Sequence, residues 1–559
     1  MIPLKPENNS PESLDLRKRY MDLDYRCGLQ SDRLWSNRDY EMNLFLPTQD
    51  AKEHEHKELE NLLHEAYLMP APDPVFALLR SHIIDFIEGQ RSNLDGVYQY
   101  PSTFISSLTN FLTFLGNQDS RPPQARLEIL LARVDLLDAL WSALRSILET
   151  SSRPQLVEAS SACSLLARVA SIEKSKAQRM YQGLSGSDME KTIAALDAFE
   201  TRGHGWAQEI GVLLENRSDD KDKGDIVTVG PERYRSVLET ELGVSLDELL
   251  DWYEEEVEKT RSEFVETAAN LNLPGHTVKG PLDAVEIMNK YAGPADSPSE
   301  MFERMERYLA RAKKACRDWV NMPEEDCRVV PVYEQCRETY PWGGYGGGCP
   351  RRRPLLGEVF LNDTNYKAVT DGWIKINAVH ECYPGHHVQW VRTTLDPLPE
   401  TMKLGAKRVP MEEGMCHRTE RLMEYIYDDD PFYPLAVAYR RHHTSVRIKA
   451  DLYMQYFGRP LEDAIKLYMD ELGFDYQTAR GQAVSQLPQN RIGYFTCYYY
   501  GMKKLEDMES RYGYDRRTFT EYLFSLPYVS LSNFEAFLTL SDHDKERLLT
   551  QFPSNLEYK

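Results

Sequence analysis

Apolar residues recur through most of this sequence at the three- and four-residue spacing of an amphipathic helix. In residues 125–149 they fall at Leu127, Leu130, Leu131, Val134, Leu137 and Leu140, on one face of a helix with about 3.6 residues per turn. Helix is also predicted for 10–120, 155–215, 232–242, 246–271, 299–321 and from 371 to the C-terminus. We therefore expect a mainly α fold.

Two short runs of β-branched and aromatic residues interrupt this pattern, at 328–333 and 358–361. Such runs are typical of strands. The segment between them is rich in glycine, from Trp342 to Cys349, and is predicted to be a turn or a mobile active-site loop. The fold should therefore contain a few short strands near the active site.

A polar and charged stretch at 216–224 has no apolar periodicity and is predicted to be an exposed loop. It divides the chain into an N-terminal helical region, residues 1–215, and a catalytic region, residues 225–559. We expect the two regions to form one compact unit. The oligomeric state does not follow from the sequence.

Composition excludes some classes of partner. The net charge is −22, whereas a nucleic-acid-binding protein needs a concentrated basic face. No apolar stretch is long enough to span a bilayer. The first ten residues lack the apolar segment of a secretory signal, and the nine cysteines are scattered without CxxC pairs. We expect a cytoplasmic protein with no nucleic-acid or membrane partner.

The chemistry concentrates in residues 377–390, where His380 and Glu381 precede a Pro-Gly break and two further histidines. Imidazole and carboxylate are the ligands of catalytic zinc. On an unbroken helix, at about 100° per residue, His386 faces away from His380, and His387 returns to the same side about 10 Å further along. A bend at Pro384 could bring His386 back, so either histidine is a candidate ligand.

The run from His380 to Gln389 resembles the His-Glu-x-x-Pro-Gly-His-His-x-Gln signature of the domain of unknown function 885 family. Residues 413–422, Glu-Gly-Met-Cys-His-Arg-Thr-Glu-Arg-Leu, resemble a helix of the same family. The segment that starts at Val229 resembles the family's segment upstream of the signature. The resemblance covers roughly residues 200 to 510. It implies a zincin-like metallopeptidase of largely helical fold.

By this resemblance, His380, His386 and Glu413 would hold one Zn²⁺ per chain, although other divalent first-row metals also suit these ligands. Glu381 would act as the general base toward water. Glu420 would orient a ligand histidine or bind a substrate amine. A surface carboxylate paired with a neighbouring arginine is the plainer interpretation of Glu420.

The chain departs from the family in its substrate-facing residues. Arg418 stands where the family has tyrosine, and Gln455, in the stretch that begins at Arg447, stands where it has histidine. Tyr498 is retained and could donate a hydrogen bond to a developing oxyanion, or be a core aromatic. With Glu420 and His387, the residues Arg418, Arg447 and Gln455 are predicted to contact substrate or support the ligands.

Three hypotheses follow. The first is a zinc-dependent hydrolase that cleaves an amide in a peptide or small amino-acid conjugate. The second is a metal-dependent enzyme of specialised metabolism that catalyses cyclisation, elimination or rearrangement. The third is a catalytically inactive binding or scaffold protein, which the intact His380, Glu381 and Glu413 disfavour. Uptake of ¹⁸O from labelled water distinguishes the first two, and metal content separates both from the third.

Overall fold

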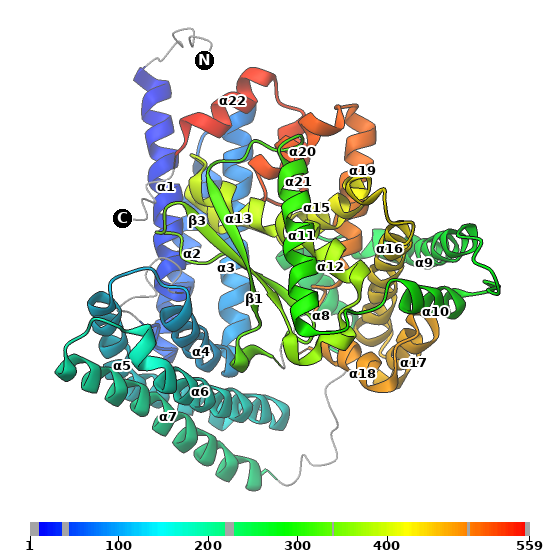
Figure 1. Cartoon of the computed structure of the whole chain (residues 1–559). Coiled ribbons are helices and arrows are strands. Elements are labelled where there is room, and N and C mark those ends of the chain that lie inside the picture. Colours follow the sequence, from blue (N-terminus) through cyan, green and yellow to red (C-terminus); the bar gives the residue numbers. More distant parts are fainter. Residues whose placement is uncertain (1–10, 36–43, 218–227, 338–339, 489–491, 554–559) are drawn as a thin grey trace.

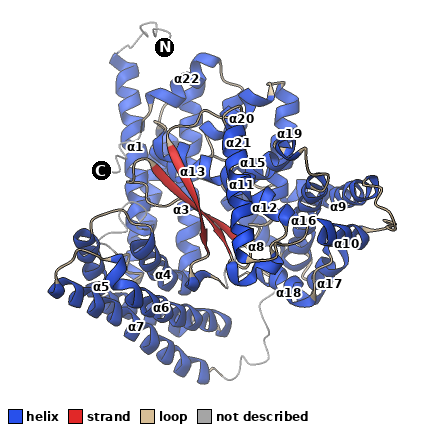
Figure 2. Ribbon diagram, in the orientation of Figure 1, coloured by secondary structure: helices blue, strands red, loops and turns tan. Residues whose placement is uncertain are grey.

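The computed structural model of the chain describes residues 11–35, 44–217, 228–337, 340–488 and 492–553. The described part is mainly helical, with one small sheet (Figures 1 and 2). The mainly α prediction is confirmed. The predicted loop at 216–224 lies, from residue 218 on, outside the described residues. None of the described helices combines the length and the apolar character that crossing a bilayer requires.

The N-terminal helices divide between two hydrophobic clusters. Helices α4 to α7, with Val97 of α3, form one cluster around residues such as Phe111 and Phe199, with Trp141 stacked on Trp206 at 4.8 Å. Helices α1 to α3 instead share a cluster with the C-terminal part of the chain. The bounds are α1 Pro11–Trp35, α2 Gln49–Leu68, α3 Pro74–Gln99, α4 Ser102–Asn117, α5 Pro123–Thr150, α6 Arg153–Met180 and α7 Gly186–Glu215.

The remaining helices belong to the C-terminal part of the chain, which contains the site described below. They are α8 Pro231–Ser236, α9 Leu246–Asn270, α10 Pro281–Tyr291, α11 Pro298–Cys316, α12 Asp371–Asn377, α13 His386–Leu395, α14 Glu400–Leu404, α15 Val409–Leu422, α16 Tyr433–Asp451, α17 Leu461–Leu472, α18 Tyr476–Ser485, α19 Thr496–Tyr512, α20 Arg516–Ser525, α21 Leu531–Leu538 and α22 Asp542–Gln551.

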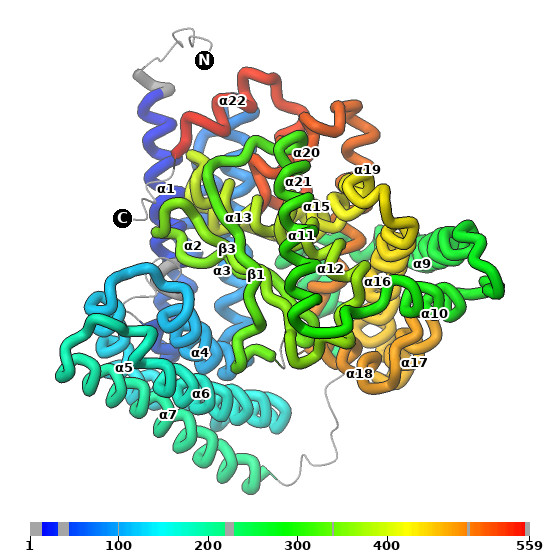
Figure 3. Tube along the Cα trace, viewed as in Figure 1, coloured from blue at the N-terminus to red at the C-terminus, as the bar shows by residue number. Residues whose placement is uncertain are grey.

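Segments from the two ends of the chain lie side by side. In Figure 3 the last helix, α22, runs beside the blue helices of the N-terminus. Arg547 of α22 pairs with Asp73, the residue that caps α3, at 3.1 Å. Asp24 of α1 accepts backbone hydrogen bonds from Glu400 and Thr401 at the start of α14, at 2.6 and 3.1 Å. Helices α1 and α3 therefore pack against the C-terminal part of the chain.

The sheet has the order β1-β3-β2, with β1 Glu325–Pro331, β2 Gly343–Gly346 and β3 Leu355–Leu361. Strand β1 is parallel to β3, and β2 is antiparallel to it. The two predicted strands correspond to β1 and β3. Strand β2 is a correction, because it lies in the glycine-rich segment predicted to be a loop. Strand pairing uses backbone hydrogen bonds, which glycine can form. A glycine-rich strand therefore lacks the side-chain alternation by which strands are predicted.

Candidate metal centre

A tight turn separates the two predicted histidine ligands. Helix α12, capped by the Thr370 side chain, runs into one wide π-helical turn, Ala378–Cys382, that carries His380 and Glu381. Gly385 then caps α13, which begins at His386. A Cβ atom on Gly385 would lie 2.0 Å from the carbonyl oxygen of His380. The turn is therefore so tight that only glycine fits at this position.

This turn brings together His380 and His386, and α15 adds Glu413. One ligand atom from each lies within 4.8 Å of the others. Glu413 Oε2 is 3.4 Å from His380 Nε2 and 3.3 Å from His386 Nε2. Among the described residues, this buried oxygen has no hydrogen-bond partner. Buried polar atoms are normally satisfied, so this oxygen, placed between two imidazoles, is a candidate ligand atom for a cation.

His380 is oriented from its other side by a buried chain of polar groups. Its Nδ1 lies 2.8 Å from Glu420 Oε1, and Glu420 Oε2 lies 2.9 Å from His417 Nδ1. His417 Nε2 in turn contacts the Thr444 hydroxyl at 2.9 Å. A carboxylate acceptor fixes the proton on Nδ1 and leaves the Nε2 lone pair free to bind a metal. Glu420 is thus a buried support for His380.

The histidines and carboxylates of the cluster shift one another's pKa values. Burial favours the neutral imidazole, but Glu413 and Glu420 outweigh it and raise the pKa of His380. Burial would likewise raise the pKa of Glu413, yet His386 and His380 hold it well below the usual range. For Glu420, His417 and His380 overcome the effect of burial and lower the pKa. Both carboxylates are therefore anionic at neutral pH.

His386 is oriented in the same way as His380, by a different acceptor. Its Nδ1 lies 2.7 Å from Gln389 Oε1, and the Gln389 amide donates to the backbone carbonyl of Glu412 at 2.7 Å. The sulfur of Cys416 is 3.6 Å from the same Nδ1. Nε2 of His386 is therefore presented toward Glu413. The signature contained Gln389, but the pattern did not indicate its role.

His387, the alternative ligand, lies outside the cluster. Its Nδ1 contacts the Tyr345 hydroxyl at 2.9 Å, and its Nε2 contacts the Glu325 carboxylate, which also accepts from Tyr383. Burial lowers the pKa of His387 despite Glu325. His387 thus ties α13 to strands β1 and β2. The roles of Glu325 and Tyr345 could not be predicted from sequence, because both residues are brought next to His387 by the folding of strands β1 and β2.

Two tyrosines border the cluster. Tyr494, which the sequence interpretation missed, donates a hydrogen bond to Glu413 Oε1. The Tyr498 hydroxyl lies 3.4 Å from that of Tyr494, and its ring stacks on His380 at 6.0 Å. Burial raises the pKa of Tyr498, so it stays a protonated donor. Glu381 is half-buried and forms no hydrogen bond or ion pair within the described chain, which leaves its carboxylate available.

The remaining predicted residues are not in the cluster. Arg418 points toward α19 and α20, where it pairs with Glu509 at 2.9 Å. Gln455 bonds to the backbone of Gln486 at 2.9 Å and of Val229 at 3.2 Å. The Arg447 guanidinium lies 5.6 Å from the Tyr498 ring centre. Arg447 therefore borders the site, whereas Arg418 and Gln455 join helices away from the three ligand atoms.

Fold and site define a mainly helical protein with a buried cluster of two histidines and one glutamate. Residues 38–522 match the family described as "Bacterial protein of unknown function (DUF885)". The chain belongs to this family. None of the curated proteins compared with it matches.

Two solved structures share the fold. A "putative lipoprotein of unknown function" from Shewanella oneidensis superposes with a TM-score of 0.72 at 14% identity, over 94% of this chain and 99% of that one. A "putative lipoprotein" from Colwellia psychrerythraea superposes with a TM-score of 0.70 at 14% identity, over 96% and 99%. At this identity the likeness shows the fold alone.

The cytoplasmic prediction is contradicted by these two structures, because both proteins are described as lipoproteins. The prediction relied on the lack of an apolar segment in the first ten residues and on the scattered, unpaired cysteines. In the structure all nine are unpaired, and all but Cys336 are buried. A buried thiol is shielded from oxidants and partners in any compartment, so unpaired cysteines do not indicate the cytosol.

Proposed function

We propose that this protein is a zinc-dependent hydrolase of the zincin type, which cleaves an amide bond in a peptide or small amino-acid conjugate. One observation carries the proposal. Three ligand atoms, from His380, His386 and Glu413, converge within 4.8 Å around a buried carboxylate oxygen that has no hydrogen-bond partner in the described chain. Two histidines and one glutamate form a known ligand set of catalytic zinc.

The donor chemistry fits a zinc ion. Both imidazoles have their Nδ1 atoms engaged, by Glu420 and Gln389, so each can present its Nε2 to a cation. Glu413 supplies an anionic oxygen and keeps its other oxygen bonded to Tyr494. When bound, zinc supplies Lewis acidity toward a carbonyl and toward water. Three protein ligands leave one coordination position for the reactants.

The other residues have roles in the same reaction. Glu381 follows His380 directly, and its carboxylate, without a partner in the described chain, accepts the proton of the attacking water. It then returns that proton to the leaving amine. Tyr498, which stacks on His380, donates its hydroxyl proton in a hydrogen bond to the developing oxyanion. Glu420 fixes the orientation of His380 throughout.

The test compares Glu381→Gln with the matched control Glu412→Gln on a panel of dipeptides and N-acyl amino acids in H₂¹⁸O. Glu412 is next to Glu413, but its side chain pairs with Arg408 at 3.2 Å, away from the cluster. We expect Glu381→Gln to keep its zinc and lose about 10³-fold in turnover, within the range of general-base catalysis. Glu412→Gln should stay within a few-fold of wild type.

Mass spectrometry of the products decides the reaction class. Hydrolysis places one ¹⁸O atom in the new carboxylate. Turnover without ¹⁸O uptake, or full activity in the zinc-loaded Glu381→Gln variant, would reject the proposal.

A further inference from the structure

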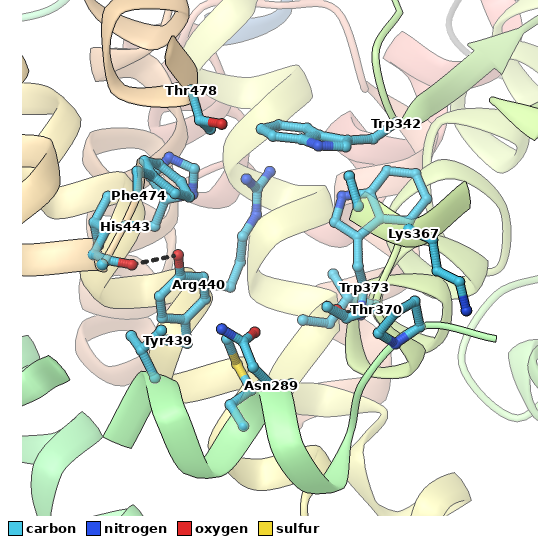
Figure 4. Close-up of a pocket in the computed structure, with 18 of the residues that line it drawn as sticks. Asn289, Trp342, Lys367, Thr370, Trp373, Tyr439, Arg440, His443, Phe474 and Thr478 are labelled. Atoms are coloured by element: carbon cyan, nitrogen blue, oxygen red, sulfur yellow. Dashed lines mark hydrogen bonds between the residues drawn. The ribbon is translucent and has the colours of Figure 1, made fainter. Parts of the chain in front are cut away.

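A cavity of about 430 Å³ opens beside the candidate metal centre, between α10, α12, α16 and the start of α18. Aromatic side chains form much of its wall (Figure 4). Its lining includes Trp342, Trp373, Tyr439, Arg440, His443 and Phe474. Tyr439 is held by a hydrogen bond to the Leu472 carbonyl at 3.2 Å. An apolar cavity with a few polar groups is the usual form of a small-molecule site.

Arg440 is a cation that lines this cavity. Figure 4 shows its side chain extending into the space between Phe474 and Trp342. Its Nε lies 3.6 Å from Glu420 Oε1 and has no hydrogen-bond partner in the described chain. The guanidinium stands 5.3 Å from the Tyr498 ring centre. The Arg440 side chain is 20% exposed, and its Nη atoms form no hydrogen bond to a described residue, so the guanidinium can receive a ligand.

The other titratable groups of the cavity do not compete for an anion at that position. Burial, with nearby Arg447 and Arg440, lowers the pKa of His443 well below its usual range, so His443 is neutral. Lys367 is a second cation of the lining, but its ammonium donates to the Ala295 carbonyl at 3.1 Å, and Figure 4 shows its side chain leading away from Arg440. Asp475 is exposed and caps α18 through the Thr478 amide. Arg440 is therefore the group that would favour a negatively charged ligand.

Two connections link the cavity to the metal cluster. Arg440 contacts Glu420, which lies 2.8 Å from His380 Nδ1. In addition, Trp373 and Asn377 line the cavity from α12, the helix that leads directly into the turn carrying His380. A ligand in the cavity thus lies next to the elements that hold the candidate catalytic residues.

We propose that this cavity binds the end of the substrate that carries a free carboxylate beside an aromatic or large aliphatic side chain. This inference rests on the proposed hydrolase and names its substrate class: dipeptides or N-acyl amino acids with an apolar C-terminal residue. The carboxylate pairs with Arg440, whose planar guanidinium suits two parallel hydrogen bonds. The side chain packs among Trp342, Trp373 and Phe474.

The experiment titrates metal-free protein with N-acetyl-phenylalanine and, separately, with N-acetyl-phenylalaninamide, by calorimetry. Without metal, the carboxylate cannot bind through zinc. We expect wild type to bind the acid at one site, at least tenfold more tightly than the amide. Arg440→Gln should abolish that preference by weakening the acid about tenfold or more.

Two further variants complete the design. Arg421→Gln is the matched control, because Arg421 follows Glu420 but pairs with Glu263 on α9. It should bind like wild type. Trp342→Ala, next to the start of β2, should weaken acid and amide alike. If Arg440→Gln does not fold, the acid–amide preference and Trp342→Ala still decide the matter.

Failure of this proposal is distinct from failure of the proposed function. Equal binding of acid and amide, no binding of either, or an unchanged preference in Arg440→Gln would overturn the carboxylate subsite while leaving zinc hydrolysis intact. Arg440-dependent binding of the acid, in a protein that takes up no zinc, would instead reject the hydrolase.

Discussion

Asp451 is a buried carboxylate whose protonation affects the stability of the fold. Its Oδ2 accepts hydrogen bonds from Tyr234 at 2.8 Å and Thr496 at 3.0 Å, so it joins α8, α16 and α19. Its Oδ1 has no partner in the described residues. Burial raises its pKa from 3.8 to about 7, although the two hydroxyl donors and the backbone of Gly493 oppose this. At neutral pH Asp451 is therefore partly ionised, and its buried charge lowers the stability of the folded state.

We expect Asp451→Asn to change how stability depends on pH. Because the folded-state pKa is the higher one, Asp451 contributes stability that is fully present below about pH 4 and is lost as pH rises toward 7. That contribution is at most about 4 kcal/mol. Urea unfolding at pH 4.0, 5.5 and 7.5 measures it, with the exposed Asp318→Asn as control. An unchanged difference between wild type and Asp451→Asn across this range would contradict the assignment.

At the scale of elements, the π-helical turn and Gly385 determine which histidine meets His380. The turn ends at Cys382, and the amide of Gly385 bonds to its carbonyl at 3.0 Å. His386 consequently faces Glu413, while His387 faces β1. The spacing of residues on a straight helix left this choice open. Only the resemblance favoured His386, because a bend cannot be read from helical periodicity.

We expect Gly385→Ala to disrupt the cluster. The new Cβ would lie 2.0 Å from the His380 carbonyl oxygen and 2.3 Å from that of Val379, which requires backbone movement costing about 3 kcal/mol. Gly89→Ala is the control, because nothing lies within 4 Å of a Cβ there and it sits inside α3. Thermal unfolding and zinc titration should show lower stability and weaker binding for Gly385→Ala alone. Wild-type zinc affinity in that variant would contradict the role given to the turn.

Helices were predictable from sequence because their buried faces repeat, as in α5, Pro123–Thr150, predicted at 125–149. Strand β2 was not, because Gly343–Gly346 has almost no side chains to show a period. Tyr494 was missed for a different reason. It bonds to Glu413 from 81 residues away, and such a contact depends on how α15 and α19 pack.

At the scale of the whole molecule, one hydrophobic cluster runs from Tyr20 to Phe552 and includes the surroundings of the site. The N-terminal α1 belongs to it through Asp24, which accepts three hydrogen bonds, from the Glu400 amide and from the amide and hydroxyl of Thr401. Helix α14 lies between α13 and α15, which carry His386 and Glu413. The N-terminal helices thus support the segment that joins two candidate ligands.

We expect Asp24→Ala to lower the free energy of unfolding by about 3 kcal/mol, because two buried amides lose their acceptor. The control is Asp22→Ala, in which an exposed carboxylate loses its ion pair with Arg26 and stability should change by less than about 1 kcal/mol. Urea unfolding followed by circular dichroism measures both. An equal loss of unfolding free energy in Asp24→Ala and Asp22→Ala would show that the packing of α1 does not depend on this contact.

The central claim is that His380, His386 and Glu413 hold a metal ion, and zinc content measured after reconstitution and dialysis tests it most directly. We predict about one zinc per chain in wild type and in His387→Ala, because His387 binds Glu325 and Tyr345 instead. His380→Ala, His386→Ala and Glu413→Ala should each lose the metal while staying folded by circular dichroism. No zinc in reconstituted wild type, or loss of zinc in His387→Ala with retention in His386→Ala, would contradict the claim.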